Sequence, residues 1–271
     1  MARIHPLAYV DPTAELAEGV EVGPFCYVGP GVRLGPRCRL LNHVSIHGPA
    51  TIGADNVFFP FCSIGAEPQD LSYHGEPSRT EIGDRNVFRE GVTVHRGTAK
   101  DALLTRIGND GLFMACSHIA HDCVVEDHVI MANGVLLGGH VHVESYATFG
   151  GAAVVHHFTT IGRMAFVGGM TRVTRDVPPY MTVEGNPAKI WMVNKIGCQR
   201  RGLPPEAIAQ LKEAHRLLFR SDSGLEEAAR LLGGRQGLRP EVRYLLEFCR
   251  RSGGLKGRAR EQIRERWQHE E

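Results

Sequence analysis

A short segment near the middle of the chain carries histidines beside a carboxylate. The chain has 14 His among its 271 residues, and His118 and His121 lie three positions apart, with Asp122 directly after the second. An imidazole with a pKa of about 6.5 can take a proton from a weakly nucleophilic hydroxyl. A neighbouring carboxylate can orient the ring and stabilise the imidazolium. His121 and Asp122 are therefore candidates for general-base chemistry.

More histidines follow in the same region. They are His95, His118, His121, His128, His140, His142, His156 and His157. A histidine on a protein surface is more often solvated or hydrogen-bonded than functional, and we interpret His128 and His142 in that way. Cys123, next to the candidate pair, is expected to be a small packed residue. Whether the other histidines meet depends on the elements that carry them.

Those elements follow from an apolar residue that recurs every six positions. The positions are Val10, Leu16, Val22, Val28, Leu34, Leu40, Ile46, Ile52, Phe58, Ile64, then Ile82, Phe88, Val94, then Ile107, Phe113, Ile119, Val125, Met131, Leu137, Val143, Phe149, Val155, Ile161, Val167 and Val173. A period of six fits neither an α-helix nor a long alternating strand. It indicates short strands joined by tight turns, for which the 32 Gly are suited.

Three such units, or 18 residues, form one triangular coil of a β-helix, and coils stack about 4.8 Å apart. Residues 18 apart then lie above one another. His121, Gly139 and His157 form one column, and Asp122 and His140 form the next. The repeat thus gathers imidazoles, a carboxylate and a glycine backbone on one patch. A glycine N–H lets a substrate approach closely and can donate to an oxyanion.

The six-residue register breaks after Ile64 and again near Thr98–Thr105, which predicts two loops. The repeat ends near Asp176, where Pro178 and Pro179 mark a boundary. Helical spacing then predicts helices over 205–219, 225–232, 240–250 and 259–268. We expect an all-β parallel β-helix over residues 1–190 and a C-terminal α-helical domain over 191–271, acting as a solenoid cap.

Composition narrows the class of protein. The net charge of +1 gives no general field for nucleic acid or an anionic membrane. The seven Cys form no CxxC pair, Met1–Val10 lacks an apolar signal region, and no apolar run is long enough for a transmembrane segment. We expect a cytoplasmic protein with free thiols that binds no nucleic acid.

The segment from Ser117 to Cys123 resembles the catalytic segment of the UDP-N-acetylglucosamine O-acyltransferases of lipid A biosynthesis. Further matches to this family follow in order: Gln69-Asp70-Leu71, Gly75-Glu76-Pro77, Ile82-Gly83-Asp84-Arg85-Asn86, Val94-His95-Arg96-Gly97, Gly139-His140-Val141 and Arg200-Arg201-Gly202. The resemblance covers essentially the whole chain. It implies that the β-helix is left-handed and that the protein is a homotrimer.

The resemblance also implies roles. His121 would be the general base, Asp122 its partner and Gly139 the oxyanion donor. Gly169 and Met170 would limit the length of the acyl chain. The implied substrate-binding residues are Gln69, Asp70, Ser72, His95, His118, His140, His156, His157, Asn194, Arg200 and Arg201. The implied reaction moves a 3-hydroxyacyl chain from acyl carrier protein to the 3-hydroxyl of UDP-N-acetylglucosamine, without cofactor or metal.

Two departures from the family keep alternatives open. Ser72 stands where the family commonly has Lys, and His157 where it usually has Gln. Both lie on the sugar-nucleotide side by resemblance, so N-acylation of a 3-amino UDP-sugar is the main alternative. A zinc-dependent γ-class carbonic anhydrase and a non-catalytic hexapeptide-repeat binding protein are the others. The former needs three histidine ligands, and the spacing of His118 and His121 does not match that class.

Overall fold

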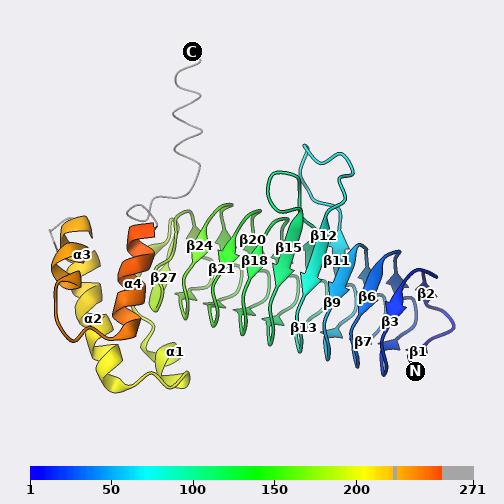
Figure 1. The fold of residues 1–271 in the computed structure, drawn as a ribbon, viewed down its shortest axis with the longest axis horizontal. Helices are drawn as coiled ribbons and strands as arrows, with labels where there is room; N and C mark the ends of the chain where they lie inside the picture. The colour runs from blue at the N-terminus through cyan, green and yellow to red at the C-terminus, as the bar shows by residue number, and fades with distance from the viewer. Residues whose placement is uncertain (222–224, 252–271) are drawn as a thin grey trace, which may run out of the picture.

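The computed structural model describes residues 1–221 and 225–251, and most of them form a parallel β-helix (Figure 1). Its strands lie in three sheets. The first contains β1 (Arg3–Ile4), β4 (Glu21–Val22), β7 (Arg39–Leu40), β10 (Val57–Phe58), β13 (Val87–Phe88), β16 (Leu112–Phe113), β19 (Ile130–Met131), β22 (Thr148–Phe149), β25 (Phe166–Val167), β27 (Met181–Glu184) and β28 (Lys189–Val193).

The second sheet contains β2 (Tyr9–Val10), β5 (Tyr27–Val28), β8 (Ser45–Ile46), β11 (Ser63–Ala66), β14 (Thr93–His95), β17 (His118–Ile119), β20 (Leu136–Leu137), β23 (Val154–Val155) and β26 (Arg172–Val173). The third contains β3 (Glu15–Leu16), β6 (Val32–Leu34), β9 (Ala50–Ile52), β12 (Arg79–Ile82), β15 (Leu104–Ile107), β18 (Val124–Val125), β21 (His142–Val143) and β24 (Thr160–Ile161). From β1 to β26 each strand pairs in parallel with the strand three positions earlier or later in the chain, so the predicted left-handed parallel β-helix is confirmed.

The core follows the six-residue repeat. Every repeat position from Val22 to Val173 is buried in one cluster, and Val10 and Leu16 pack against it partly exposed. Smaller residues two positions earlier, such as Val20 and Cys26, are buried in the same cluster. The prism is narrow, so each coil accommodates one large and one small side chain on each side.

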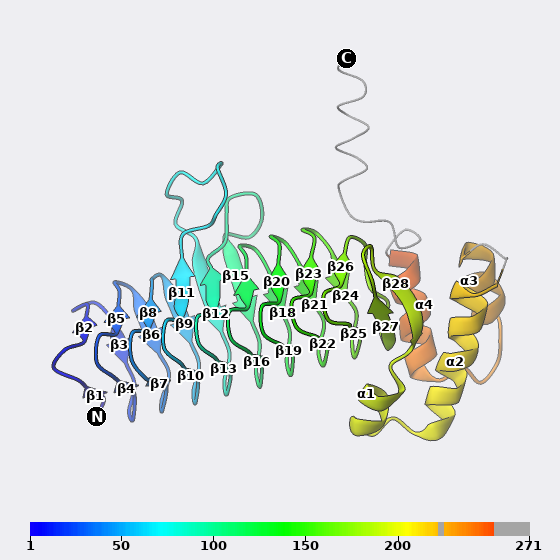
Figure 2. The ribbon, with the colours of Figure 1, turned by 180° about the vertical axis from the view of Figure 1, so that it is seen from behind.

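The two breaks in the repeat are loops on one edge of the prism. Residues 67–78 connect β11 to β12, and residues 96–103 connect β14 to β15. Both connections run from the second sheet to the third, in successive coils. They project side by side from the β-helix (Figure 2). The next turn on this edge holds His121 and Asp122, and the one after it holds Gly139 and His140.

Helices cap the far end of the β-helix. They are α1 (Lys195–Arg200), α2 (Pro205–Phe219), α3 (Leu225–Gly233) and α4 (Pro240–Arg251). The last three agree with the predicted spans to within a residue. The predicted helix at 259–268 lies outside the described residues.

Two features of the cap were not predicted. The proline-rich segment contains an antiparallel pair, β27 with β28, and the proposed domain boundary at 190/191 falls inside β28. Helix α1 was also missed, because its six residues are too short for helical periodicity to show.

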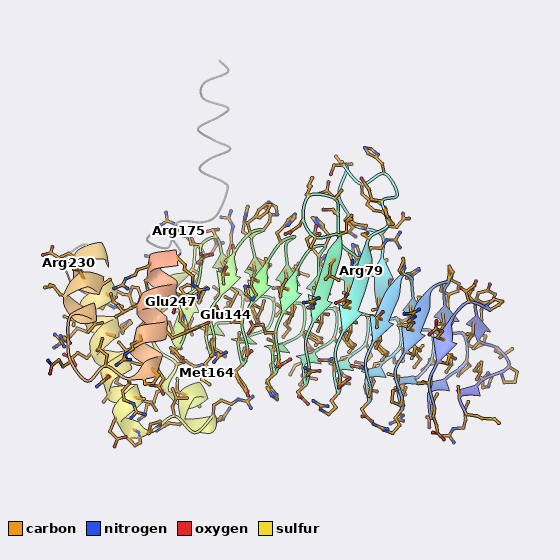
Figure 3. The ribbon with its side chains drawn as sticks, in the orientation of Figure 1. Arg79, Glu144, Met164, Arg175, Arg230 and Glu247 are labelled. Carbon is orange, nitrogen blue, oxygen red and sulfur yellow. The ribbon has the colours of Figure 1, made fainter. Side chains whose placement is uncertain are left out.

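Side chains join the cap to the last coils. The Glu144 carboxylate accepts a hydrogen bond from the backbone N–H of Arg163 at 2.7 Å and lies 3.7 Å from the Arg251 guanidinium of α4. Figure 3 shows Glu144 in the coils beside α4. The Arg163 guanidinium lies 5.5 Å from the centre of the Tyr244 ring. Among the helices of the described residues, none is both long and apolar enough to cross a bilayer.

Candidate active site

A groove of about 730 Å³ lies along the edge that carries the two loops. Its lining combines residues of both loops with residues of the coils that follow. These are Gln69, Asp70, Leu71, Lys100, His118, Ala120, His121, Leu136, Leu137, Gly138, Gly139, His140, Val154, Val155, His156, His157, Phe158, Arg172 and Val173. Polar groups gather toward the loops, and Leu136 and Val154 give the second sheet an apolar outer face. Such a groove can hold a polar ligand joined to a chain.

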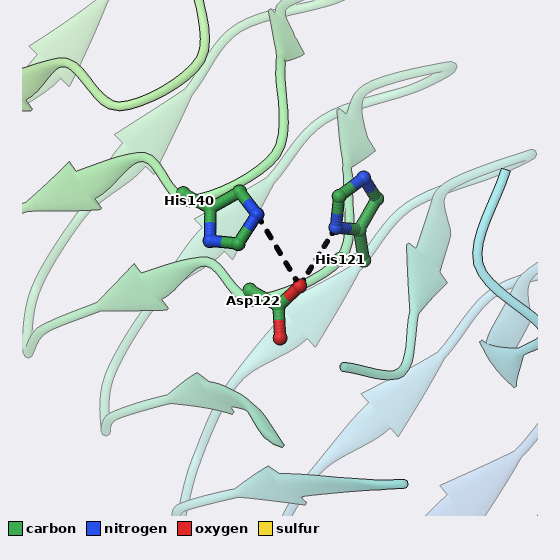
Figure 4. A group of neighbouring side chains, drawn as sticks. All are labelled: His121, Asp122 and His140. Atoms are coloured by element: carbon green, nitrogen blue, oxygen red, sulfur yellow. Dashed lines mark hydrogen bonds and ion pairs between the residues drawn. The ribbon is translucent and has the colours of Figure 1, made fainter. Parts of the chain in front are cut away.

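His121 lies at the centre of the polar part. Its Nδ1 is 2.8 Å from Asp122 Oδ2, and its ring meets the His140 ring edge-on at 5.3 Å between centroids (Figure 4). Because Asp122 accepts a hydrogen bond from Nδ1–H, the proton stays on Nδ1 and Nε2 carries the lone pair. That nitrogen faces Asp70, whose Oδ2 is 3.8 Å away in the groove lining. His121 can therefore take a proton from a ligand in the groove.

Asp122 is fully buried and held from several sides. Its Oδ1 accepts from the Thr98 N–H at 2.8 Å, and its Oδ2 accepts from the Thr98 hydroxyl at 2.6 Å. His140 Nε2 lies 3.6 Å from the same Oδ2. Burial opposes ionisation of this carboxyl, but the hydrogen bonds from His121 and Thr98 outweigh it and lower its pKa. Asp122 thus stays a carboxylate and fixes the orientation of His121.

The left-handed turn conformation helps to bring these groups together. Asp122 has φ 59° and His140 has φ 60°, in turns one coil apart. The His140 N–H donates to the His121 carbonyl at 3.0 Å, which keeps the two turns in register. His140 also stacks on Phe158 of the next coil, with ring centroids 4.3 Å apart. Asp122, His140 and Phe158, which are 18 residues apart, therefore lie above one another in one column, as the 18-residue coil predicts.

Gly139 lies beneath the His121 ring. A Cβ at this position would lie 2.5 Å from Cε1 and 2.7 Å from Nε2 of that ring, so any larger residue would displace it. In the part of the chain that the structure describes, the Gly139 N–H donates no hydrogen bond. A backbone donor is therefore available beside the candidate base, where an oxyanion would form.

Two more histidines, one in the groove wall and one behind it, are neutral because burial lowers their pKa values. His118 Nδ1 is 2.7 Å from Thr93 Oγ1, and the His118 and His95 rings meet edge-on at 5.0 Å. Burial lowers the pKa of His118 and lowers that of His95 to about 4, with a further contribution from neighbouring histidines. His118 lines the groove, whereas His95 lies behind it. His156 and His157 line its far side, with ring centroids 4.0 Å apart.

Asp70 is anchored in the groove by its own loop and by the neighbouring one. Ser72 donates to its Oδ1 from the backbone N–H at 2.9 Å and from the hydroxyl at 2.8 Å. Lys100 Nζ lies 3.0 and 2.7 Å from the two carboxylate oxygens. These bonds, chiefly that from Lys100, hold the pKa of Asp70 well below its ordinary value. Ser72 itself does not line the groove.

Three predicted binding residues lie at another edge of this chain, between the third and first sheets. Asn194 caps α1 by accepting from the Gly197 N–H at 3.0 Å, and its amide donates to the Met164 carbonyl at 2.9 Å. The Arg201 guanidinium lies 4.6 Å from the centre of the Tyr146 ring. Arg200, at the end of α1, is exposed. Within one chain, none of these side chains reaches the groove.

Sequence reasoning missed Thr98, Lys100 and Phe158. The second break in the repeat predicted a loop but not which of its residues turn toward the groove. Phe158 could have been found, because it lies 18 residues after His140 in the same column. Cys123, interpreted as a packed residue, is fully buried, and burial raises the pKa of its thiol to about 12.

Within the described residues, His121, Asp122 and His140 could hold a metal ion, since their ligand atoms lie within 4.8 Å of one another. His118, which we considered from the sequence as a zinc ligand together with His121, is outside this group. Asp122 Oδ2, the oxygen nearest to both histidines, already accepts hydrogen bonds from His121 and the Thr98 hydroxyl, and it would have to give up these bonds to bind an ion.

Known proteins resemble this chain over most of its length. A family model described as UDP N-acetylglucosamine O-acyltransferase, domain 2, matches residues 176–258. The crystal structure of the UDP-N-acetylglucosamine O-acyltransferase from Moraxella catarrhalis is 41% identical, with a TM-score of 0.89, over 92% of this chain and 97% of that one. The corresponding enzyme from Bacteroides fragilis is 34% identical, with a TM-score of 0.90 and the same coverage. That from Francisella novicida is 35% identical over 90% of each chain, with a TM-score of 0.86.

Fold and relatives together define a left-handed β-helix acyltransferase. More narrowly, the chain belongs to the UDP-N-acetylglucosamine O-acyltransferase family. It is therefore an enzyme, which sets aside the non-catalytic binding protein considered from the sequence.

Replacing the candidate base tests its role. We expect His121→Ala to keep its melting temperature and to lose at least about a hundredfold in kcat, the lower range for a general base. His142→Ala is the control, because its imidazole pairs with Glu126 away from the groove lining. Steady-state kinetics and thermal melting of both variants decide this. Near-normal turnover by a folded His121→Ala protein would exclude the assignment.

The close approach of Gly139 gives a second prediction. In Gly139→Ala the added Cβ must push the His121 ring aside, and a displacement of about 1 Å can cost about a hundredfold in rate. Gly151→Ala is the matched control, because its Cβ would meet only the Asn133 carbonyl, at an ordinary 3.5 Å. Equal kcat values for the two variants would show that His121 does not depend on this contact.

Proposed function

We propose that this protein transfers a 3-hydroxyacyl chain from acyl carrier protein to the 3-hydroxyl of UDP-N-acetylglucosamine. The observation that carries the proposal is His121, whose Nδ1 is bound by the buried Asp122 carboxylate and whose Nε2 faces the groove. The named relatives support the acceptor, since each is a UDP-N-acetylglucosamine acyltransferase. The apolar face of the second sheet supports a long acyl group.

In this mechanism His121 Nε2 removes the proton from the sugar hydroxyl as its oxygen attacks the thioester carbonyl. The Gly139 N–H donates to the oxyanion of the tetrahedral intermediate. The intermediate collapses by breaking the carbon–sulfur bond, and the imidazolium returns its proton to the leaving thiolate. Asp122 stabilises the imidazolium in between. The products are the sugar ester and the free carrier thiol, with no cofactor consumed.

We also propose that the active form is a homotrimer. Asn194, Arg200 and Arg201 lie at a different edge of the prism from the groove, so one chain alone does not combine all the implied binding residues. Around a threefold axis, that edge of one prism can approach the groove of the next. We place the reaction in the cytoplasm, since all seven cysteines are free and only Cys116 is exposed.

A transfer assay tests the reaction directly. We expect light scattering to show an assembly of three chains. We expect this trimer to acylate UDP-N-acetylglucosamine with 3-hydroxyacyl carrier protein as the donor. We expect turnover to be unchanged by a chelator, which also tests the His121, Asp122 and His140 group for a required metal. Loss of activity on chelation, recovered with zinc, would favour a metal-dependent mechanism. Acylation of only the 3-amino analogue would establish the alternative acceptor.

Acyl length gives a further prediction. Leu136 and Val154 extend the groove away from His118, and Arg172 ends it three coils, or roughly 14 Å, further on. In one chain, Gly169 and Met170 lie outside this lining, on the same coil as Arg172. Gly169 of a neighbouring copy has no side chain that would block an acyl chain running past it, so we expect a longer 3-hydroxyacyl donor to be preferred. Each buried methylene contributes about 0.8 kcal/mol.

Competition among donors of graded length measures this preference. We expect Gly169→Met to favour shorter donors, because a bulky side chain would block the end of the chain's path. Arg172→Ala is the comparison variant. If Gly169→Met leaves the length profile unchanged while Arg172→Ala lengthens it, Arg172 is the stop and the role given to Gly169 is wrong.

A further inference from the structure

Lys100 places a positive charge in the groove next to the candidate base. Its ammonium binds both oxygens of Asp70, at 3.0 and 2.7 Å, and both residues line the groove. The two side chains come from different loops, 96–103 and 67–78, which meet only because they lie one coil apart. Lys100 is half-exposed, whereas Asp70 retains 14% of its side-chain exposure. The ion pair is thus open to the groove on the Lys100 side.

The position of Asp70 makes this charge important. His121 lies between two carboxylates, Asp122 at Nδ1 and Asp70 at 3.8 Å from Nε2. Nε2 is the atom that must meet the reacting group of the acceptor. An unpaired Asp70 carboxylate would attract a cation to that place. With Lys100 bound to it, the carboxylate is neutralised and a second cation would meet an ammonium instead.

We propose that Lys100 is a specificity-determining residue that makes the groove select a neutral hydroxyl over a protonated amine at the reacting position of the sugar. This inference rests on the proposed function, because it concerns the acceptor of the same site. A hydroxyl can approach Nε2 without cost from Lys100. A protonated amine is repelled by Lys100 and cannot be bound by an Asp70 that is already paired. The effect grows when the bound substrate displaces water from the groove.

The experiment compares binding and turnover of UDP-N-acetylglucosamine and its 3-amino analogue. Dissociation constants are measured by calorimetry at a pH where the amine is protonated, and kcat/KM is measured for both acceptors. We expect Lys100→Met to raise amine binding relative to hydroxyl binding by about tenfold, as loss of one close charge interaction implies. Lys100→Arg keeps a cation in reach of Asp70, and we expect it to show the wild-type ratio of amine binding to hydroxyl binding.

Moving the cation to another residue distinguishes an effect of the Lys100 charge from a structural role of Lys100 in its loop. The Ser72 hydroxyl lies 2.8 Å from Asp70 Oδ1, so a lysine at position 72 can reach the same carboxylate from the other side. We expect Ser72→Lys to restore hydroxyl preference in the Lys100→Met background. A variant that had merely lost loop structure would not be rescued in this way.

The possible failures are distinguishable. If Lys100→Met weakens the binding of both acceptors equally, and Ser72→Lys does not change their relative binding, then Lys100 only holds its loop in place. In that case the inference is wrong while the proposed function stands. If the wild-type protein binds neither acceptor, the proposed function fails and this inference fails with it. If the wild type already prefers the amine, Lys100 does not exclude it and the inference is overturned.

Discussion

The site depends on one constraint, the parallel stacking of 18-residue coils. Each turn on the groove edge must sit directly on the previous one, because the strands on both sides of it are hydrogen-bonded in register. His121 is therefore fixed over Gly139, and Asp122 beside His140, by the backbone that also builds the core. A site of this kind is rigid before any ligand binds, and rigidity is what general-base chemistry requires of an imidazole.

The second requirement is charge balance around that imidazole. Asp122 is buried without a cation of its own and remains ionised because Thr98 and His121 donate to it. Asp70 is balanced differently, by an ammonium from the neighbouring loop. In the proposed mechanism the two carboxylates therefore have separate functions: Asp122 orients the base, and Asp70 shapes the electrostatic field that the acceptor meets. Burial keeps His95 and His118 neutral, so they add hydrogen-bonding groups without adding charge.

The same stacking explains why the chain presents its implied binding residues on two edges. A side chain in one turn can reach only the neighbouring turns of its own column or an adjacent strand. Asn194 and Arg201, which pack on Met164 and Tyr146, therefore cannot contact His121 within one prism. In the proposed homotrimer a second chain would bring these edges together, and the helical cap that carries α1 would contribute to assembly as well as closing the end of the core.

We could predict the coils, the core and the column of His121, Gly139 and His157 from the sequence, because a strict six-residue repeat has a fixed rise and register. We could also predict three helices of the cap from their apolar spacing. The sequence does not reveal that Thr98 holds Asp122 or that Lys100 neutralises Asp70, and both contacts were found only in the three-dimensional structure. Those contacts link residues 24 and 30 positions apart through loops that follow no period. Their geometry depends on two irregular backbones meeting in space, and no local pattern encodes it.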